Sequence, residues 1–89
     1  MRIKVRFSTV FQGLSGVDKT ELSLPQDATV KDALEKIVED FPKFKKWIPQ
    51  NGKVSNYIYA SVNGKFPGSE TRLKSDDEIV LFPIPVGGG

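Results

Sequence analysis

Apolar and polar residues alternate along several short stretches of the chain, and this pattern predicts β-strands. In residues 2–8, Ile3, Val5 and Phe7 alternate with charged or polar residues, as in a strand with one buried face. Residues 20–24 alternate in the same way. The segment between the two stretches contains glycines and is expected to be a loop, so the strands are expected to form an antiparallel hairpin with a long connection.

A helix is predicted next, from its first capping residue to a terminating proline. Thr29 is a candidate N-cap, and Asp32, at the third helical position, completes a variant of the capping box. Apolar residues then recur with the helical period at Val30, Ala33, Leu34, Ile37, Val38 and Phe41. This stripe predicts a helix that packs one face on a sheet. Pro42 is expected to end it, because proline breaks a backbone hydrogen bond inside a helix.

The next stretch combines aromatic residues with a further alternating pattern. Phe44 and Trp47 lie in a short segment that we expect to form a helical turn against one end of the core. Residues 57–62 alternate again and predict a strand. Its polar face carries Tyr57 and Tyr59, which either pack under a loop or contact a partner, and the sequence leaves this choice open.

Turn signals divide the rest of the chain. Asn63-Gly64 predicts a two-residue hairpin turn, because both residues tolerate positive φ. A short strand is expected near residues 65–66, an acidic turn at 75–78 and a last strand at 79–82. Together these elements predict an α+β domain, with a mixed sheet of four to five strands and one main helix packed across it.

The composition excludes most residue sets that enzymes and metal sites use. The chain of 89 residues contains no cysteine and no histidine, which excludes thiolate metal sites, cysteine nucleophiles and histidine-based triads. This length forms a single domain. A net charge of +2 is too small to indicate a nucleic-acid or membrane partner. No signal peptide or membrane span is evident, so the expected location is the cytoplasm.

Two charged clusters have alternative interpretations. The acidic residues 76–78 could hold a hard cation, but they lack the spacing of a calcium loop. We interpret them as turn residues. Three lysines between residues 43 and 46 could contact nucleic acid. We interpret them as a solvent-exposed face around buried aromatic residues.

The C-terminal sequence is the main candidate for chemistry. The chain ends in Gly87, Gly88 and Gly89. Glycine has no Cβ, so such a tail can enter a narrow active site of another protein, whereas the alternative is an ordinary frayed terminus. Pro83 and Pro85 precede the glycines and lack backbone donors, so they are expected to end strand pairing. We therefore expect a folded domain over residues 1–82 and a flexible tail over residues 83–89.

Alternate residues of the last strand face opposite sides of the sheet. Ile79 and Leu81 are expected to face the helix, which leaves an apolar stripe on the outer face. Exposed stripes of this kind mark protein interfaces, although a neighbouring strand or loop could also cover Phe82. The candidate partner-binding residues are Val80, Phe82, Pro83, Ile84 and Pro85.

These features resemble a known family. The order of elements, the Asn63-Gly64 turn and the run from Asp76 to Gly88 are similar to the small subunit of molybdopterin synthase. The sulfur-carrier proteins of thiamine synthesis and the archaeal ubiquitin-like modifiers share this outline, and the resemblance covers essentially the whole chain. It implies the β-grasp, or ubiquitin-like, fold, in which the first and last strands lie side by side at the centre of the sheet.

The resemblance also implies a function. In this family, an adenylating enzyme related to ubiquitin-activating enzymes uses ATP to convert the carboxylate of the last glycine to an acyl-adenylate. Sulfur then replaces the adenylate and gives a thiocarboxylate for molybdenum cofactor biosynthesis, or a lysine amine attacks and gives an isopeptide bond. The implied partners are the adenylating enzyme and either the larger molybdopterin synthase subunit or lysines of target proteins. The chain itself is expected to bind no cofactor or metal, to have no catalytic residue, and to be a monomer when free.

The chain departs from the family pattern at two places. The family often has an Arg-Glu pair after its first strand, whereas this chain has Gln12-Gly13, which weakens the transfer of partner contacts made from that segment. The tail has three glycines instead of two, and the reactive end is Gly89, or Gly88 after trimming. A sulfur carrier is the preferred interpretation. A protein modifier and a plain binding module on the same fold are the alternatives.

Overall fold

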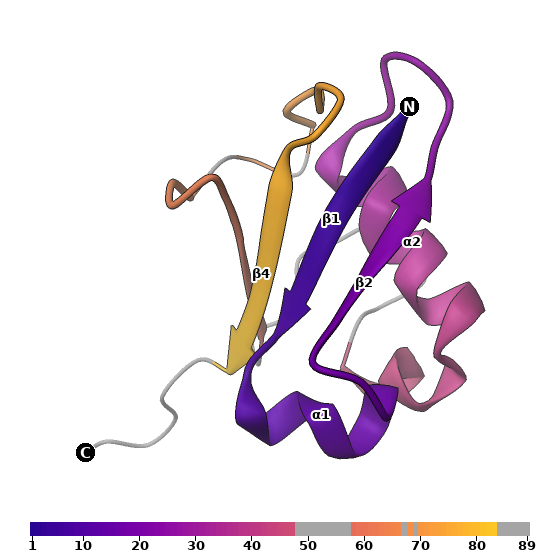
Figure 1. Ribbon diagram of the computed structural model, residues 1–89, viewed down its shortest axis with the longest axis vertical. Coiled ribbons are helices and arrows are strands. Elements are labelled where there is room, and N and C mark those ends of the chain that lie inside the picture. The colour runs from indigo at the N-terminus through magenta and orange to yellow at the C-terminus, as the bar shows by residue number, and fades with distance from the viewer. Residues whose placement is uncertain (48–57, 67, 69, 84–89) are drawn as a thin grey trace.

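The computed structural model describes residues 1–47, 58–66, 68 and 70–83 of the chain, and Figure 1 shows how its elements are arranged. Its elements in chain order are β1 (Arg2–Phe7), α1 (Thr9–Ser15), β2 (Lys19–Ser23), α2 (Val30–Asp40), the 3₁₀ helix η1 (Pro42–Lys46), β3 (Ile58–Val62) and β4 (Glu78–Pro83). The strands form one mixed four-stranded sheet in the order β2-β1-β4-β3. The expected α+β class is therefore confirmed.

The first and last strands are neighbours at the centre of the sheet. β1 pairs with β4 in parallel, with Val5 opposite Ile79, and Figure 1 shows β1 between β4 and β2. β2 pairs antiparallel with β1, and β3 pairs antiparallel with β4. This is the central pairing expected of a β-grasp fold, and it brings the two halves of the chain into a single sheet.

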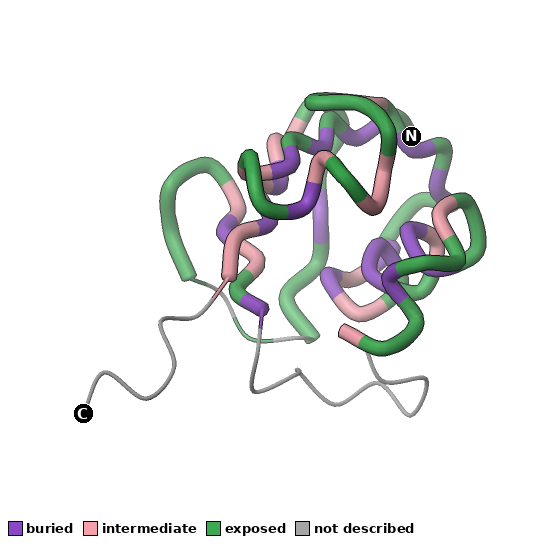
Figure 2. The backbone as a smooth tube through the Cα atoms, turned by 90° about the horizontal axis from the view of Figure 1, so that it is seen from below, coloured by how far each residue is buried: buried purple, intermediate pink, exposed green. Residues whose placement is uncertain are grey.

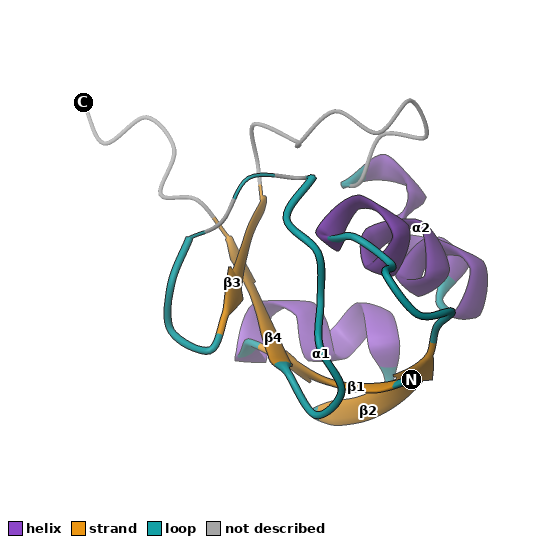
Figure 3. Ribbon diagram, turned by 90° about the horizontal axis from the view of Figure 1, so that it is seen from above, coloured by secondary structure: helices purple, strands orange, loops and turns teal. Residues whose placement is uncertain are grey.

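The hydrophobic core lies between the sheet and α2. β1 alternates exposed and buried positions from its first residue to its last, and Figure 3 shows α2 within the curve of the sheet. In Figure 2 buried positions recur along the strands and along α2, separated by exposed or intermediate ones. Fully buried large side chains include Ile3, Val5, Phe11, Leu22, Ile37, Phe44, Ile58, Ile79 and Leu81. One continuous core of this kind holds both ends of the sheet in place.

The start of α2 has the predicted capping box. The backbone N–H of Asp32 donates to the Thr29 hydroxyl at 3.3 Å, and the backbone N–H of Thr29 donates to the Asp32 carboxylate at 2.9 Å. These two bonds satisfy donors that a helix start leaves free. The predicted stripe packs as expected, with Val30, Ala33, Leu34, Ile37 and Val38 buried. The sequence therefore specifies both the start and the packed face of this helix.

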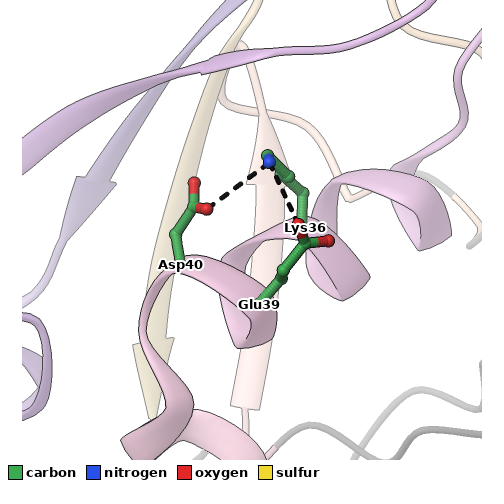
Figure 4. Close-up of polar contacts among 3 residues, drawn as sticks. All are labelled: Lys36, Glu39 and Asp40. Atoms are coloured by element: carbon green, nitrogen blue, oxygen red, sulfur yellow. Dashed lines mark hydrogen bonds and ion pairs between the residues drawn. The ribbon is translucent and has the colours of Figure 1, made fainter.

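The outer face of α2 carries a small network of charges. Lys36 Nζ lies 3.4 Å from Glu39 Oε1 and 3.5 Å from Asp40 Oδ1 (Figure 4). The carboxylate of Asp40, followed by that of Glu39, raises the pKa of the Lys36 ammonium above its ordinary value of 10.5. Residues three and four apart lie on one helix face, so these contacts hold the last turns of α2 together.

We expect the variant Lys36→Gln to lose a contribution to stability that depends on pH. Because folding raises the pKa, the contribution is complete at pH values below the unfolded pKa and disappears as the pH rises through the folded pKa. Urea unfolding of Lys36→Gln and of the unsubstituted protein at pH 7, 9 and 11.5 measures this contribution. The difference between their free energies of unfolding should shrink only at the highest pH. Lys31→Gln, in the same helix, is the control. An unchanged difference at the highest pH would contradict the assignment.

The segment between β1 and β2 is not the expected loop, because it contains the helix α1. Phe11 is fully buried, and its ring centroid lies 5.6 Å from that of Phe44 and 5.3 Å from that of Trp47. Gly13, which suggested a loop, is an exposed residue inside the helix. Gly16 then ends it as a left-handed C-cap with φ 78°, a conformation that glycine adopts without strain. Packing of the buried face therefore overrides weak local helix propensity here.

Other boundaries differ by small amounts from the predictions. Residues 65–66 form no strand, and only an isolated bridge joins Lys65 to Val62. β4 extends one residue beyond its expected end, and Pro83 lies opposite Ile58 at the end of the pairing. The predicted turn of helix around Phe44 is present as η1. Tyr57, the expected first residue of β3, lies outside the described residues.

Candidate functional site

The outer face of β4 is the first part of the candidate site. Ile79 and Leu81 are fully buried on the core side, while Val80 and Phe82 are half-buried on the opposite side. This is the alternation expected from the sequence. The structure thus places two of the candidate partner-binding residues together on a face that α2 does not cover.

Three aromatic rings meet on this face and form what we call the aromatic cluster: Tyr59, Phe66 and Phe82. The ring centroids are 5.5 Å apart for Tyr59–Phe66, 5.7 Å for Tyr59–Phe82 and 5.8 Å for Phe66–Phe82. Tyr59 is 41% exposed and Phe66 is 64% exposed. Tyr59 therefore contributes to an exposed apolar surface, and its contact with a partner stays a prediction. Tyr57, the other tyrosine of this choice, lies outside the described residues.

Phe66 is the part of the site that sequence reasoning missed. The predicted turn at Asn63-Gly64 forms, with φ 51° and 82°, and the bridge between Val62 and Lys65 closes it. The chain after the turn runs back along β3, so the residue after Lys65 reaches the ring of Tyr59. A two-residue hairpin fixes this register. Reading the register forward from the turn would have found Phe66.

The aromatic cluster has the properties of a protein-binding surface. Water-exposed aromatic rings gain more free energy on burial than other side chains, because each can bury a large apolar area. Aromatic residues are enriched at interfaces and among the residues that dominate binding. The contacts between Tyr59, Phe66 and Phe82 also hold the rings in place before a partner binds, which reduces the entropy lost on association.

The site continues toward the C-terminus along β4. Pro83 is the last residue of the strand and is half-buried. Ile84, Pro85 and the glycines at 87–89 lie outside the described residues, and their roles stay predictions. The outer face of β4 thus leads directly toward the glycine sequence.

The acidic stretch before β4 acts as a turn that fastens two strands together. Asp77 accepts a hydrogen bond from the Lys74 backbone N–H at 2.7 Å and another from Asn63 Nδ2 at 2.9 Å. Asn63 Oδ1 in turn accepts from the Glu78 backbone N–H at 3.0 Å. Within the described parts of the chain, no group of three or more acidic side chains is arranged to hold a metal ion. These residues therefore shape the turn, as the spacing predicted.

Two further features that the sequence singled out, Gln12 and the lysines of η1, have structural explanations. The side-chain amide of Gln12 donates to the backbone carbonyl of Phe7 at 3.3 Å, so the residue that replaces the family's charged pair supports the junction of β1 and α1. The three lysines of η1 are exposed around the fully buried Phe44, the arrangement expected of a solvated face. None of the helices in the described ranges is long and apolar enough to span a membrane.

Comparison with known proteins identifies the family. Residues 5–89 match the model of the ThiS family. The chain belongs to the ThiS family. This membership agrees with the β-grasp order of the sheet and with the resemblance found in the sequence, which is thereby confirmed.

Several known proteins are similar to this chain over nearly its whole length. Small archaeal modifier protein 3 of Haloferax volcanii is 27% identical over the full length of both proteins. The crystal structure of SAMP1 from Haloferax volcanii has a TM-score of 0.86 at 26% identity, with complete coverage of both chains. The putative molybdopterin converting factor, subunit 1, from Pyrococcus furiosus has a TM-score of 0.80 at 30% identity, and the match covers 93% of this chain and 97% of that one. The chain is therefore a small ubiquitin-like protein that is similar to archaeal modifier proteins and to a putative molybdopterin converting factor subunit.

Proposed function

We propose that this protein is a sulfur carrier of the molybdopterin synthase small-subunit type, which acts through its C-terminal glycine. Its partners would be an adenylating enzyme related to ubiquitin-activating enzymes and the larger subunit of the synthase. Because the activation consumes ATP, we place the reaction in the cytoplasm. The protein is then a substrate of its partners and not an enzyme in its own right.

The observation that supports this proposal is the path of β4. Its outer face carries Val80 and Phe82 next to Tyr59 and Phe66, and the same strand leads to Gly87–Gly89 within a few residues. A partner that covers the aromatic cluster is thereby positioned to receive the terminal carboxylate. The 30% identity to a putative molybdopterin converting factor subunit favours the carrier role.

The chemistry requires an external enzyme. A terminal carboxylate has a pKa of roughly 3.5, so it is ionised at neutral pH and is a poor electrophile. In the proposed activation the carboxylate oxygen attacks the α-phosphorus of ATP, which releases pyrophosphate and leaves an acyl-adenylate. Hydrosulfide supplied by a partner then attacks the carbonyl carbon and expels AMP, which leaves a thiocarboxylate on Gly89, or on Gly88 after trimming. The absence of cysteine from the chain fits a carrier whose sulfur is held on the backbone carboxyl.

A protein modifier is the second candidate, and it rests on a separate observation. Small archaeal modifier protein 3 is 27% identical over both full lengths, and the structure of SAMP1 superimposes over the whole chain. In this role the ε-amine of a lysine on a target protein displaces AMP from the same acyl-adenylate and forms an isopeptide bond. The two candidates share every step up to the final nucleophile.

Intact-mass measurement of the protein purified from its native cells tests both candidates. We expect a population in which sulfur replaces one oxygen at the C-terminus. Conjugates on other proteins would favour the modifier, and trypsin would leave the remnant Ser75–Gly89 on the target lysine, because Lys74 is the last cleavage site. A chain with neither sulfur nor conjugates, in cells that make both kinds of product, would contradict the proposal.

A further inference from the structure

The turn that follows β3 contains a dipeptide with chemistry of its own. Asn63 is followed by Gly64, both have positive φ, and both are exposed to solvent. In an Asn-Gly sequence the backbone nitrogen of the glycine can attack the side-chain carbonyl carbon of the asparagine, because glycine has no Cβ to hinder the approach. Asparagine is among the thermolabile residues of proteins for this reason.

The reaction replaces the side-chain amide by a carboxyl group. The Gly64 nitrogen forms a bond to Cγ of Asn63, its proton passes through water to the departing amide, and ammonia leaves as a cyclic imide closes. Water then opens the ring at one of its carbonyl carbons. Opening at Cγ leaves aspartate in the ordinary backbone, whereas opening at the main-chain carbonyl leaves isoaspartate, whose backbone contains an extra carbon. The reaction consumes only water and releases only ammonia.

Both ends of the Asn63 amide are held by hydrogen bonds to a distant part of the chain. Nδ2 donates to the Asp77 carboxylate at 2.9 Å, and Oδ1 accepts from the Glu78 backbone N–H at 3.0 Å. The backbone N–H of Asn63 also donates to the Glu78 carbonyl oxygen at 2.9 Å. Rotation of Cγ toward the Gly64 nitrogen requires the side-chain bonds to break, and each of them adds to the free energy of that opening.

We propose that Asn63 is a deamidation site, and that its bonds to Asp77 and Glu78 delay the reaction until the turn opens. Opening of an exposed turn is rapid compared with deamidation, so the rate of deamidation follows the population of the open turn. Because exposed segments open at a small cost in free energy, the reaction proceeds in the folded protein, but more slowly than in the unfolded chain.

The products weaken the turn and the surface next to it. An aspartate at position 63 cannot donate to Asp77, and the two carboxylates repel each other at this separation. Isoaspartate lengthens a two-residue turn whose length sets the register of the hairpin. Phe66 follows this turn, and its ring centroid lies 5.5 Å from that of Tyr59 and 5.8 Å from that of Phe82. Deamidation therefore loosens the aromatic cluster in aged molecules.

The test follows tryptic peptides by mass during prolonged incubation of the full-length protein in buffer and in concentrated guanidinium chloride at the same pH. Trypsin separates Asn63, in residues 54–65, from the other Asn-Gly of the chain, Asn51-Gly52, in residues 47–53. In guanidinium chloride the two sites should react at comparable rates, which provides the internal reference. In buffer Asn63 should react at least about fivefold more slowly than in guanidinium chloride, since one typical hydrogen bond changes an equilibrium by about this factor.

The variant Asp77→Ala removes the acceptor of the Asn63 amide. It should raise the rate at Asn63 in buffer about fivefold and leave the rate in guanidinium chloride unchanged. Glu35→Ala removes the same charge from the exposed face of α2 and should change neither rate. The comparison of buffer with guanidinium chloride needs no variant, so the test stands even where Asp77→Ala does not fold.

The variant Asn63→Asp reproduces one product directly. It should lower the thermal midpoint, and it should shift the aromatic NMR signals of Tyr59, Phe66 and Phe82. Deamidated protein isolated after incubation should show the same changes. These measurements connect the modification to the aromatic cluster without involving the C-terminal glycines, so they stand apart from the proposed carrier chemistry.

Three results would overturn the inference. Equal rates at Asn63 in buffer and in guanidinium chloride would mean that the fold gives no protection. Equal rates in Asp77→Ala and Glu35→Ala would remove the role of the Asp77 carboxylate. Deamidated protein that keeps the thermal midpoint and aromatic signals of fresh protein would show that the modification does not reach the aromatic cluster.

Discussion

Deletion of Gly87–Gly89 is expected to abolish formation of the acyl-adenylate and of every product made from it. In the proposed activation a carboxylate oxygen of the last glycine attacks ATP. A tail three residues shorter ends in Val86, whose branched side chain cannot enter a channel shaped for glycine. ATP–pyrophosphate exchange catalysed by the cognate activating enzyme measures the effect. Exchange should fall to the level seen without the protein.

The thermal stability of the folded domain is the control for this deletion. The three deleted glycines have no side chains to bury, so the thermal midpoint should stay unchanged. Removal of Gly89 alone separates the two possible reactive ends, because a chain that is naturally trimmed to Gly88 would then react normally. Full exchange activity without any of the three glycines would refute the proposed carrier and modifier roles together.

Phe44→Ala is expected to be the most damaging single substitution for stability. Phe44 is fully buried, and its ring contacts Phe7 at 5.4 Å and Phe11 at 5.6 Å between centroids. Truncation of a buried phenylalanine costs about 3–5 kcal/mol, a large part of the about 5–15 kcal/mol that stabilises a typical domain. The free energy of unfolding in urea measures the loss.

Phe66→Ala is the matched control for this prediction. It removes the same side chain from a position that is 64% exposed, so the free energy of unfolding should change by less than about 1 kcal/mol. Its effect should instead appear in binding to the aromatic cluster. Similar losses of stability in the two variants would mean that Phe66 belongs to the core and not to a binding surface.

Local patterns in the sequence were sufficient to predict α2 and the faces of the strands. The capping residues Thr29 and Asp32 act through bonds only three residues apart, and the alternation in β4 separates Leu81 from Phe82 without reference to other elements. Both signals are local, and each agrees with the environment that the fold provides. Elements whose local preference agrees with the fold can be predicted from the sequence alone.

The features that were missed depend on contacts between distant residues. α1 is stabilised by the packing of Phe11 on Phe44 and Trp47, and these partners lie more than thirty positions away. The sequence of the segment, with a glycine inside it, has little helix propensity of its own. Phe66 likewise became visible only through its contacts with Tyr59 and Phe82. The position of β1 beside β4 was expected from the family resemblance and not from the pattern of residues.

The parallel pairing of β1 with β4 has a consequence for biosynthesis. A nascent polypeptide released before Glu78 would lack the strand that joins β1 to β3, so β1 would keep an open edge that invites aggregation. Closure of the sheet is a high-contact-order event, because it pairs β1 (Arg2–Phe7) with β4 (Glu78–Pro83). The glycines are translated after β4, so any molecule that carries them also contains every strand of the sheet. An activating enzyme that binds the outer face of β4 would therefore use ATP only on molecules in which the sheet is complete.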